Sequence, residues 1–349
     1  MMKNKMKDSL KLAVLCLMAG ITFAACSDWT EVEGVNVEQQ SPADKYPELY
    51  AQYLQKLRNY KQAEHKVVYA WFDNSQKAPF SRGQHITAVP DSVDVIALMF
   101  PDKLADFELK EMESVRSEKG TKVVYTISYE AIKRAYDELV KAETAKDAAY
   151  VAPNFEAYLK EATVNALKLQ STYNYDGIIV GYKGKSMLHM TAAEKEQYTK
   201  EQTVFMNEIS AWYTANKNKM IAFEGYPQYV VNREILKSCR NIILNTADIT
   251  TSSMLTVEAL QAIVPDVPTE QFVVTARTTS LDSTDKKTGY YDGSLRAITE
   301  AAYWVTNNEV SFTKAGLGIY NVQNDYYNPN NVYQYVRQAI NIMNPAPKN

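Results

Sequence analysis

Aromatic, amide and charged side chains recur at one kind of place in this chain of 349 residues, at or just after the ends of short apolar runs. Aromatic rings stack on the flat faces of sugars, and amides, carboxylates and cations form hydrogen bonds with hydroxyl groups. If the run ends converge in the fold, they form a rim suited to a sugar ligand. The candidate ligand contacts are Trp71, Asp73, Tyr129, Tyr182, Lys183, Glu224, Tyr226, Asn245, Arg277, Tyr320 and Asn321.

The same residues do not favour a metal or an organic cofactor. They include no His, no Cys and no cluster of three carboxylates, and the whole chain has only 3 His and 3 Cys. Protein metal centres are built mainly from those side chains. No Gly-x-Gly-x-x-Gly follows the first apolar run, so a dinucleotide-binding fold is not indicated. We therefore expect no metal and no cofactor.

The overall composition favours an ordinary globular protein, with 46% hydrophobic and 23% charged residues. The formal net charge of −3 argues against a nucleic-acid partner, because a phosphate-binding surface needs an excess of Lys and Arg. The 25 Tyr greatly outnumber the 10 Phe. Amphipathic rings in that number suit a surface that holds a sugar.

The apolar runs alternate with segments of helical periodicity. Most runs are apolar without strict alternation, as expected for strands that are buried on both faces of a parallel sheet. They span 66–72, 93–100, 122–128, 176–181, 219–224, 240–245, 271–277 and 316–321. The predicted helices span 104–119, 155–169, 192–217, 230–237, 257–263, 295–305 and 332–342.

This alternation predicts the α/β class and a single (β/α)8 barrel, a TIM barrel, over 46–349. A doubly wound open sheet is the alternative. In a barrel of this kind, ligands bind at the carboxyl ends of the strands, which is where the rim candidates fall. No shift of composition marks a second domain.

The first 25 residues read as a signal peptide rather than as part of the fold. Lysines precede an uncharged stretch at 12–23, and small residues follow it. That stretch is too short to span a hydrocarbon core of about 30 Å. The predicted polar tether then covers 26–45.

The residues around the predicted cleavage site resemble a lipoprotein signal. Phe-Ala-Ala-Cys at 23–26 is similar to the bacterial lipobox, which implies acylation of Cys26. Ser27, Asp28 and Glu31 resemble the export signal that sends Bacteroidetes lipoproteins to the outer face of the outer membrane. We expect a surface-facing outer-membrane protein that touches the membrane through its lipid anchor only. An ordinary secretory peptide with a free Cys26 is the alternative.

The fourth run carries a family resemblance. Its sequence NYDGIIVGYK at 174–183 resembles the signature Asp-Gly-x-x-x-Asp-x-Glu, which lies on the fourth strand of glycoside hydrolase family 18 barrels. The segments EKGTKVV at 118–124 and LGIYN at 317–321 agree with it, and the resemblance covers about 66–342. It implies similarity to the endo-β-N-acetylglucosaminidase-like surface lipoproteins of gut Bacteroidetes.

The chain departs from that signature at the catalytic positions. In the family the acetamide of the substrate attacks the anomeric carbon, one Asp orients it, and a Glu two residues later protonates the leaving oxygen, an exception to the usual two-carboxylate scheme. Here Asp176 aligns with the opening Asp, but Gly181 and Lys183 stand at the two catalytic positions. Gly has no side chain, and the ordinary Lys pKa of ~10.4 makes proton donation at neutral pH unfavourable. Asp176 is expected to fix its neighbours and to contribute to the site.

Three functions remain open from the sequence. The first is a catalytically inactive protein that captures N-acetylglucosamine-containing glycans of the N-glycan type for an outer-membrane glycan-uptake complex. The second is an active endo-β-N-acetylglucosaminidase with a relocated general acid, either Glu224 or, less directly, Glu130 or Asp73. The third is a structural subunit that uses the barrel for protein contacts alone.

Overall fold

The computed structural model describes residues 42–308 and 311–346. The predicted signal peptide, Cys26 and most of the predicted tether lie outside these residues. The chain divides into two compact units, 1–51 and 52–349. The described part of the first unit holds α2 (Pro42–Lys45) and the start of α3 (Pro47–Gln62). Among the described residues, no helix combines the length and the apolar character needed to cross a bilayer.

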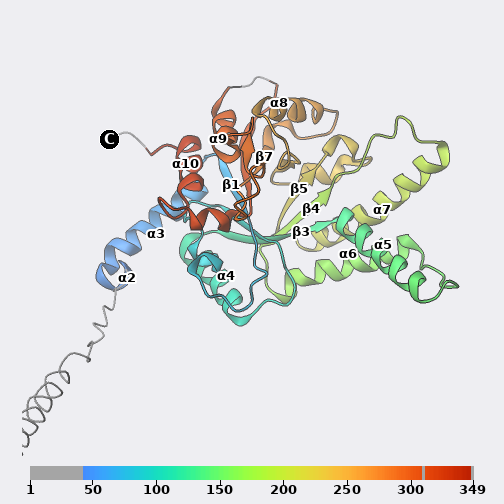
Figure 1. Cartoon of the computed structure of the whole chain (residues 1–349), viewed down its shortest axis with the longest axis horizontal. Coiled ribbons are helices and arrows are strands. Elements are labelled where there is room, and N and C mark those ends of the chain that lie inside the picture. Colours follow the sequence, from blue (N-terminus) through green and yellow to red (C-terminus); the bar gives the residue numbers. More distant parts are fainter. Residues whose placement is uncertain (1–41, 309–310, 347–349) are drawn as a thin grey trace, which may run out of the picture. The chain divides into compact units, whose positions relative to one another are not determined.

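Eight parallel strands of the second unit close into a barrel, which confirms the predicted (β/α)8 architecture and excludes the open sheet (Figure 1). Each strand pairs with its neighbours in chain order, and β1 closes the ring against β10. The barrel strands are β1 (Val67–Phe72), β2 (Val95–Leu98), β3 (Lys122–Ser128), β4 (Gly177–Tyr182), β5 (Met220–Gly225), β6 (Ile242–Leu244), β7 (Phe272–Arg277) and β10 (Lys314–Tyr320).

Alternating side chains along each strand fill two apolar cores. In β1, Tyr69 and Trp71 belong to the cluster inside the barrel, whereas Ala70 and Phe72 pack against the surrounding elements. In β4, Ile179 faces inward while its neighbours face outward. Strands buried on both sides therefore need β-branched and aromatic residues at nearly every position, which explains their continuous apolar runs.

The connections between strands carry most of the helices. Helix α4 (Asp106–Lys119) joins β2 to β3, both α5 (Tyr129–Lys146) and α6 (Phe155–Thr172) join β3 to β4, and α7 (Ala192–Ala215) joins β4 to β5; α5, α6 and α7 lie side by side (Figure 1). Helix α8 (Ser252–Gln261) lies between β6 and β7, a small hairpin of β8 (Tyr290–Tyr291) and β9 (Leu295–Arg296) precedes α9 (Ala297–Thr306), and α10 (Gln334–Met343) follows β10.

Short 3-10 helices take the place of an α-helix in the β1–β2 and β5–β6 connections, and two more accompany α8 and α10. They are η1 (Arg82–Gln84), η2 (Ile86–Ala88), η3 (Pro227–Tyr229), η4 (Arg233–Ser238), η5 (Thr269–Gln271) and η6 (Val322–Tyr327). The α-helix expected at 230–237 is therefore wrong in type, because η4 is a 3-10 segment in which only Ile235 and Leu236 are buried.

Helix α5 was not expected from the sequence. It begins directly after β3, where the Ser128 hydroxyl caps it by accepting the Ala131 N–H at 3.2 Å. None of its residues is fully buried, although Tyr129 and Ile132 pack against the outer core. Its position matters because its first turns form one wall of the barrel mouth.

Candidate functional site

A cavity of about 470 Å³ lies at the carboxyl ends of the strands. This is the end at which (β/α)8 barrels bind their ligands. Strands β1 to β5 and β10, the first turns of α5, and the connections β2–α4, β4–α7 and β6–α8 contribute to its walls. The lining residues are Trp71, Leu98, Met99, Thr126, Ser128, Glu130, Ala131, Arg134, Gly181, Tyr182, Lys183, Glu224, Gly225, Asn245 and Tyr320.

Glu224 is one of the two carboxyl side chains that line this cavity. It lies on β5 in register with Gly181 of β4, keeps a small accessible surface, and accepts a hydrogen bond from the Tyr320 hydroxyl. Burial raises the pKa of Glu224, while the hydrogen bonds from Tyr320 and Thr126 and the charge of Lys183 act in the opposite direction. The protonated, neutral acid is thereby favoured relative to a carboxyl group in water.

Tyr320 and Trp71 form a stacked pair beneath the cavity. Their ring centroids lie 4.4 Å apart with an interplanar angle of 15°, and the Arg277 guanidinium lies over the Tyr320 ring at 5.2 Å. Burial and the neighbouring Glu224 carboxyl raise the pKa of Tyr320, so its hydroxyl stays a hydrogen-bond donor. Trp71 is only 3% exposed. Its ring face is therefore covered by protein and is not free to stack on a sugar.

Gly181, near the carboxyl end of β4, and Lys183, just beyond it, supply no carboxyl group to the cavity. Gly181 pairs in register with Ser128, and a Cβ atom at Gly181 would lie 3.0 Å from Thr126 Cγ2 and 3.2 Å from Ser128 Cα. Side chains of β3 thus fill the space into which a larger residue would extend. Lys183 is exposed at the cavity, one residue beyond the end of β4.

Glu130, the second carboxyl group on the cavity wall, is held by backbone. Its Oε1 accepts the N–H of Lys183 at 2.6 Å and that of Gly184 at 3.2 Å, and its Oε2 accepts the Ser128 hydroxyl at 3.4 Å. These bonds connect the first turn of α5 to the end of β4. The three bonds fix the position of the carboxyl group on the cavity wall.

Four further candidates lie beside the cavity without lining it. The Tyr226 hydroxyl accepts from Asn245 Nδ2 at 2.9 Å, and the Arg277 Nε donates to Asp248 at 2.7 Å. Asn321 has its amide nitrogen 3.9 Å from the sulfur of Met99. Asp73 accepts the backbone N–H of Ser75 at 2.9 Å, so its carboxyl group serves a local turn.

The remaining aromatic candidates turn away from the barrel axis. The Tyr129 hydroxyl donates to Glu201 at 2.6 Å, and Tyr129 lines a neighbouring cavity of about 410 Å³ between α5 and α7. Tyr182 lines both cavities, but its hydroxyl accepts from the buried Gln202 of α7 at 2.8 Å and the residue is only 1% exposed. Its ring belongs to the outer core rather than to an open binding face.

Asp176 lies at the start of β4 rather than at its carboxyl end. Its Oδ2 accepts the Val123 N–H at 2.8 Å, and both of its oxygens lie 3.1 Å from Arg116 Nε. It does not line the cavity. The aligned aspartate therefore joins β4 to β3 and α4, as expected for a residue that fixes its neighbours, and makes no contact with the candidate site.

Several lining residues were missed from the sequence. Thr126 and Ser128 could have been found, because they alternate with the inward-facing Val124 on β3. Arg134 could not be predicted from the sequence, because its place on the cavity wall depends on helix α5, which was not expected.

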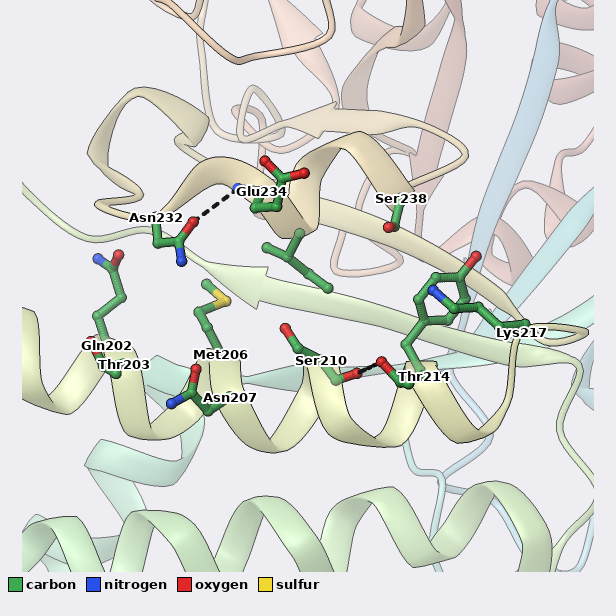
Figure 2. Close-up of a pocket in the computed structure, with 12 residues that line it drawn as sticks. Gln202, Thr203, Met206, Asn207, Ser210, Thr214, Lys217, Asn232, Glu234 and Ser238 are labelled. Atoms are coloured by element: carbon green, nitrogen blue, oxygen red, sulfur yellow. Dashed lines mark hydrogen bonds between the residues drawn. The ribbon is translucent and has the colours of Figure 1, made fainter.

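A further cavity, of about 320 Å³, lies outside the barrel between α7 and η4 (Figure 2). Amide and hydroxyl groups such as Asn207, Ser210 and Asn232 border it, and the Asn232 side chain accepts the Glu234 N–H at 3.1 Å. It exists because the short η4 leaves part of α7 uncovered. In the part of the chain that the structure describes, no group of three or more His, Cys, Asp or Glu side chains is placed to hold a metal ion.

Comparisons with known proteins agree with the barrel fold. The model of the family described as glycoside hydrolase family 18, BT1044-like, matches residues 30–342. A selenomethionyl variant of BT1044 superposes with a TM-score of 0.61 at 17% identity, over 88% of this chain and 96% of that one. No curated protein sequence matches the chain.

Two solved structures of an endo-beta-N-acetylglucosaminidase from Cordyceps militaris are also similar. The apo form gives a TM-score of 0.58 at 16% identity over 84% of this chain and 96% of that one. A double mutant in complex with fucosyl-N-acetylglucosamine-Asn gives a TM-score of 0.54 at 16% identity over 84% of this chain and 95% of that one. At these identities the likeness establishes the fold.

Proposed function

Because this chain belongs to glycoside hydrolase family 18, we propose that it binds an N-acetylglucosamine-containing glycan of the N-glycan type at the barrel mouth without cleaving it. The observation that carries the proposal is the pair of interior positions on β4. Gly181 offers no group to orient an acetamide, and Lys183 offers no acid. The cavity itself is open and lined by hydrogen-bonding groups.

The chemistry of the family explains why this pair is decisive. Substrate-assisted cleavage needs a carboxyl group that holds the acetamide and a second one that protonates the leaving oxygen. General acid catalysis alone typically contributes 10²–10⁴-fold to the rate. The positive charge of Lys183 also opposes the positive charge that develops on the sugar ring in the transition state.

The polar groups that remain are suited to holding a sugar. The Asn245 amide, the Tyr320 hydroxyl and the Glu224 carboxyl lie on one cavity wall and supply donors and acceptors for hydroxyl and acetamide groups. The Cordyceps militaris relative, seen in complex with fucosyl-N-acetylglucosamine-Asn, supports this class of ligand. Affinity then depends on hydrogen bonds rather than on the buried ring of Trp71.

Calorimetric titration of the purified soluble domain with high-mannose, complex and chitin-type oligosaccharides tests binding. We expect saturable heats with at least one N-glycan, and a loss of about tenfold in affinity for Asn245→Ala, since one good hydrogen bond to a ligand is worth about 1.4 kcal/mol. Asn207→Ala, in the outer cavity of Figure 2, is the matched control and should leave affinity unchanged. An absence of heat with every oligosaccharide rejects the proposal and favours a structural subunit.

One observation favours a second candidate, an active endo-β-N-acetylglucosaminidase that uses Glu224 as its acid. A carboxyl group whose pKa is raised by burial is the form that a general acid needs. Two observations argue against this candidate. Glu130 is held by two backbone N–H groups, and β4 offers no carboxyl group that could orient the acetamide while Glu224 acts as the acid. Incubation with an N-glycoprotein followed by mass spectrometry decides the question. Cleavage by the native protein that Glu224→Gln abolishes would establish the enzyme and overturn the binding protein.

We further propose that the protein is held at the outer face of the outer membrane by acyl chains on Cys26 and supplies glycans to an uptake complex. The basis is the leader sequence and the residues that follow it. Cys26→Ala should release the protein from the membrane fraction, and protease added to intact cells should degrade the native form. Retention of the variant in the membrane, or protection from protease, would contradict the anchor or the exposure respectively. Cross-linking in intact cells tests for the uptake complex.

A further inference from the structure

The wall of the mouth cavity carries two cationic side chains that have no hydrogen-bond or ion-pair partner among the described residues. Lys183 lies beyond β4, and Arg134 lies on α5; both are exposed and both line the cavity. Within residues 42–308 and 311–346, neither side chain forms an ion pair or a hydrogen bond. Two other cations nearby are paired: Lys133 with Asp137 at 2.5 Å and Arg277 with Asp248 at 2.7 Å.

The two carboxyl groups of the cavity do not neutralise these cations by contact. Glu130 precedes Arg134 by one helical turn, yet its oxygens are occupied by the N–H groups of Lys183 and Gly184 and by Ser128. Glu224 is bound by Tyr320. Its burial shifts it toward the neutral acid, which leaves the positive charge in excess. An incoming anion therefore meets free cations and breaks no existing pair.

We propose that the mouth cavity selects a glycan carrying an acidic group, a carboxylate or a sulfate ester on a sugar, which binds between Lys183 and Arg134. This rests on the proposed glycan binding and adds the charge class of the ligand. The planar guanidinium of Arg134 matches the paired oxygens of a carboxylate or a sulfate, and the Lys183 ammonium adds a mobile donor. A neutral sugar would leave both cations to water.

The position of Lys183 supports an anionic ligand. A residue at the family's acid position has been exchanged for a cation, and Arg134 approaches the same cavity from a different element. A single exposed Lys is commonplace, but two unpaired cations on one cavity wall form a recess for an anion. The exchange that removes cleavage thus also changes what the cavity attracts.

The test compares one complex N-glycan in its sialylated and desialylated forms, titrated into the native protein at low and high salt. We expect the sialylated form to bind about tenfold more tightly at low salt, and this advantage to shrink as salt screens the charges. A sulfated form of the same glycan provides the second arm. A preference for either acidic form over the neutral one supports the proposal and identifies the anion.

Three substitutions, two of them also combined in a double variant, make the assignment residue by residue. Lys183→Gln and Arg134→Gln should each reduce the preference for the acidic over the neutral glycan, and the double variant should abolish the preference. Lys160→Gln on α6, a residue 63% exposed and paired with Glu208, removes the same charge elsewhere and should leave the preference unchanged. All three replaced side chains are exposed, and thermal unfolding verifies that each variant is folded.

The possible failures are distinguishable. Equal affinity of the native protein for the acidic and neutral forms overturns the anion recess while the proposed glycan binding stands. A preference that survives the double variant, or that Lys160→Gln also removes, overturns the assignment to this wall. If no form binds, the proposed function fails and the recess fails with it.

Discussion

The two ends of β4 differ in what their charged side chains contact. At the start of the strand, Asp176 accepts from the Val123 N–H and from Arg116, and Lys122 lies 3.7 Å away. Just beyond its end, Lys183 is exposed and has no partner in the described protein. The charged side chain at the start of β4 thus holds strands together, whereas the one just beyond its end lines the cavity.

The same contrast extends around the barrel. At the amino-terminal end, Asp94 accepts from His65 at 2.9 Å and from the Val68 N–H at 2.8 Å, and the Lys61 ammonium donates to Val93 O at 2.7 Å. The charged side chains at that end form hydrogen bonds within the fold, whereas Lys183 and Arg134 at the mouth remain available to a ligand. In a (β/α)8 barrel, these are the places expected for stability and for ligand chemistry respectively.

The largest expected effect is on the closed end. Asp176→Ala leaves the Arg116 guanidinium and the Val123 N–H without their acceptor, and we expect the free energy of unfolding to fall by about 3 kcal/mol. Urea denaturation measures it. Asp137→Ala, which removes an exposed helical ion pair, should cost less than about 0.5 kcal/mol. Similar losses for the two variants would remove the contrast between the ends.

Restoring the missing carboxyl groups at the mouth should not restore an enzyme. In the double variant Gly181→Asp with Lys183→Glu, the new Cβ at position 181 meets Thr126 and Ser128, and overpacking of this kind costs about 1–3 kcal/mol. We expect no cleavage of an N-glycoprotein by mass spectrometry.

Adding Thr126→Ser removes the methyl group that would lie 3.0 Å from a Cβ atom at position 181, and it should recover part of the lost stability. Full activity in the double variant would instead mean that only two side chains separate this protein from a hydrolase.

A smaller effect depends on pH. His65 has both ring nitrogens facing acceptors, Ala63 O at 2.8 Å and Asp94 Oδ1 at 2.9 Å, and the hydrogen bond with Asp94 raises the pKa of His65 from 6.5. The charged form is favoured in the folded state. Its stabilising contribution is therefore complete below about pH 6.5 and disappears as pH rises through the higher folded-state pKa.

His65→Gln should accordingly lower the free energy of unfolding by about 1 kcal/mol in mildly acidic solution and by less in alkaline solution. Denaturation of both proteins across this pH range measures the difference. A difference that grows toward alkaline pH would contradict the doubly protonated ring.

The smallest expected change in stability is at the open end. Lys183→Met removes a charge that no protein group binds, so the free energy of unfolding should stay within about 0.5 kcal/mol of the native value. A clear loss of stability in the same denaturation experiment would show that Lys183 has a structural partner. It would then be unsuitable as a free cation for ligands.

The bounds of the strands could be predicted closely because burial on both faces requires a continuous run of apolar residues in the sequence. The run at 122–128 coincides with β3 (Lys122–Ser128), and that at 66–72 differs from β1 (Val67–Phe72) by one residue. Helix α5 faces solvent and has no such run of apolar residues, so neither α5 nor the place of Arg134 on the cavity wall was predicted. Short segments such as η4 carry helical spacing over too few residues to distinguish a 3-10 helix from an α-helix.

The candidate site was predictable in location but only partly in composition. Residues at the end of a strand alternate in direction, so Gly181 and Lys183 belong to the interior while Tyr182 points to α7. The prediction that every strand-end residue contacts the ligand therefore included Tyr182, whose side chain points to the outer face of the barrel. The stacking of Tyr320 on Trp71 joins residues far apart in the chain, and no local pattern could indicate it.

The carboxyl group of Glu130 restrains the cavity wall in a way that solvent exchange would reveal. It binds the N–H groups of Lys183 and Gly184, next to an exposed side chain, and it belongs to a helix that starts without any intervening loop after β3. Deuterium should therefore enter these two amides slowly, although their neighbours are wet. The cavity wall is therefore already ordered before a glycan binds, so little of the binding free energy is needed to order it.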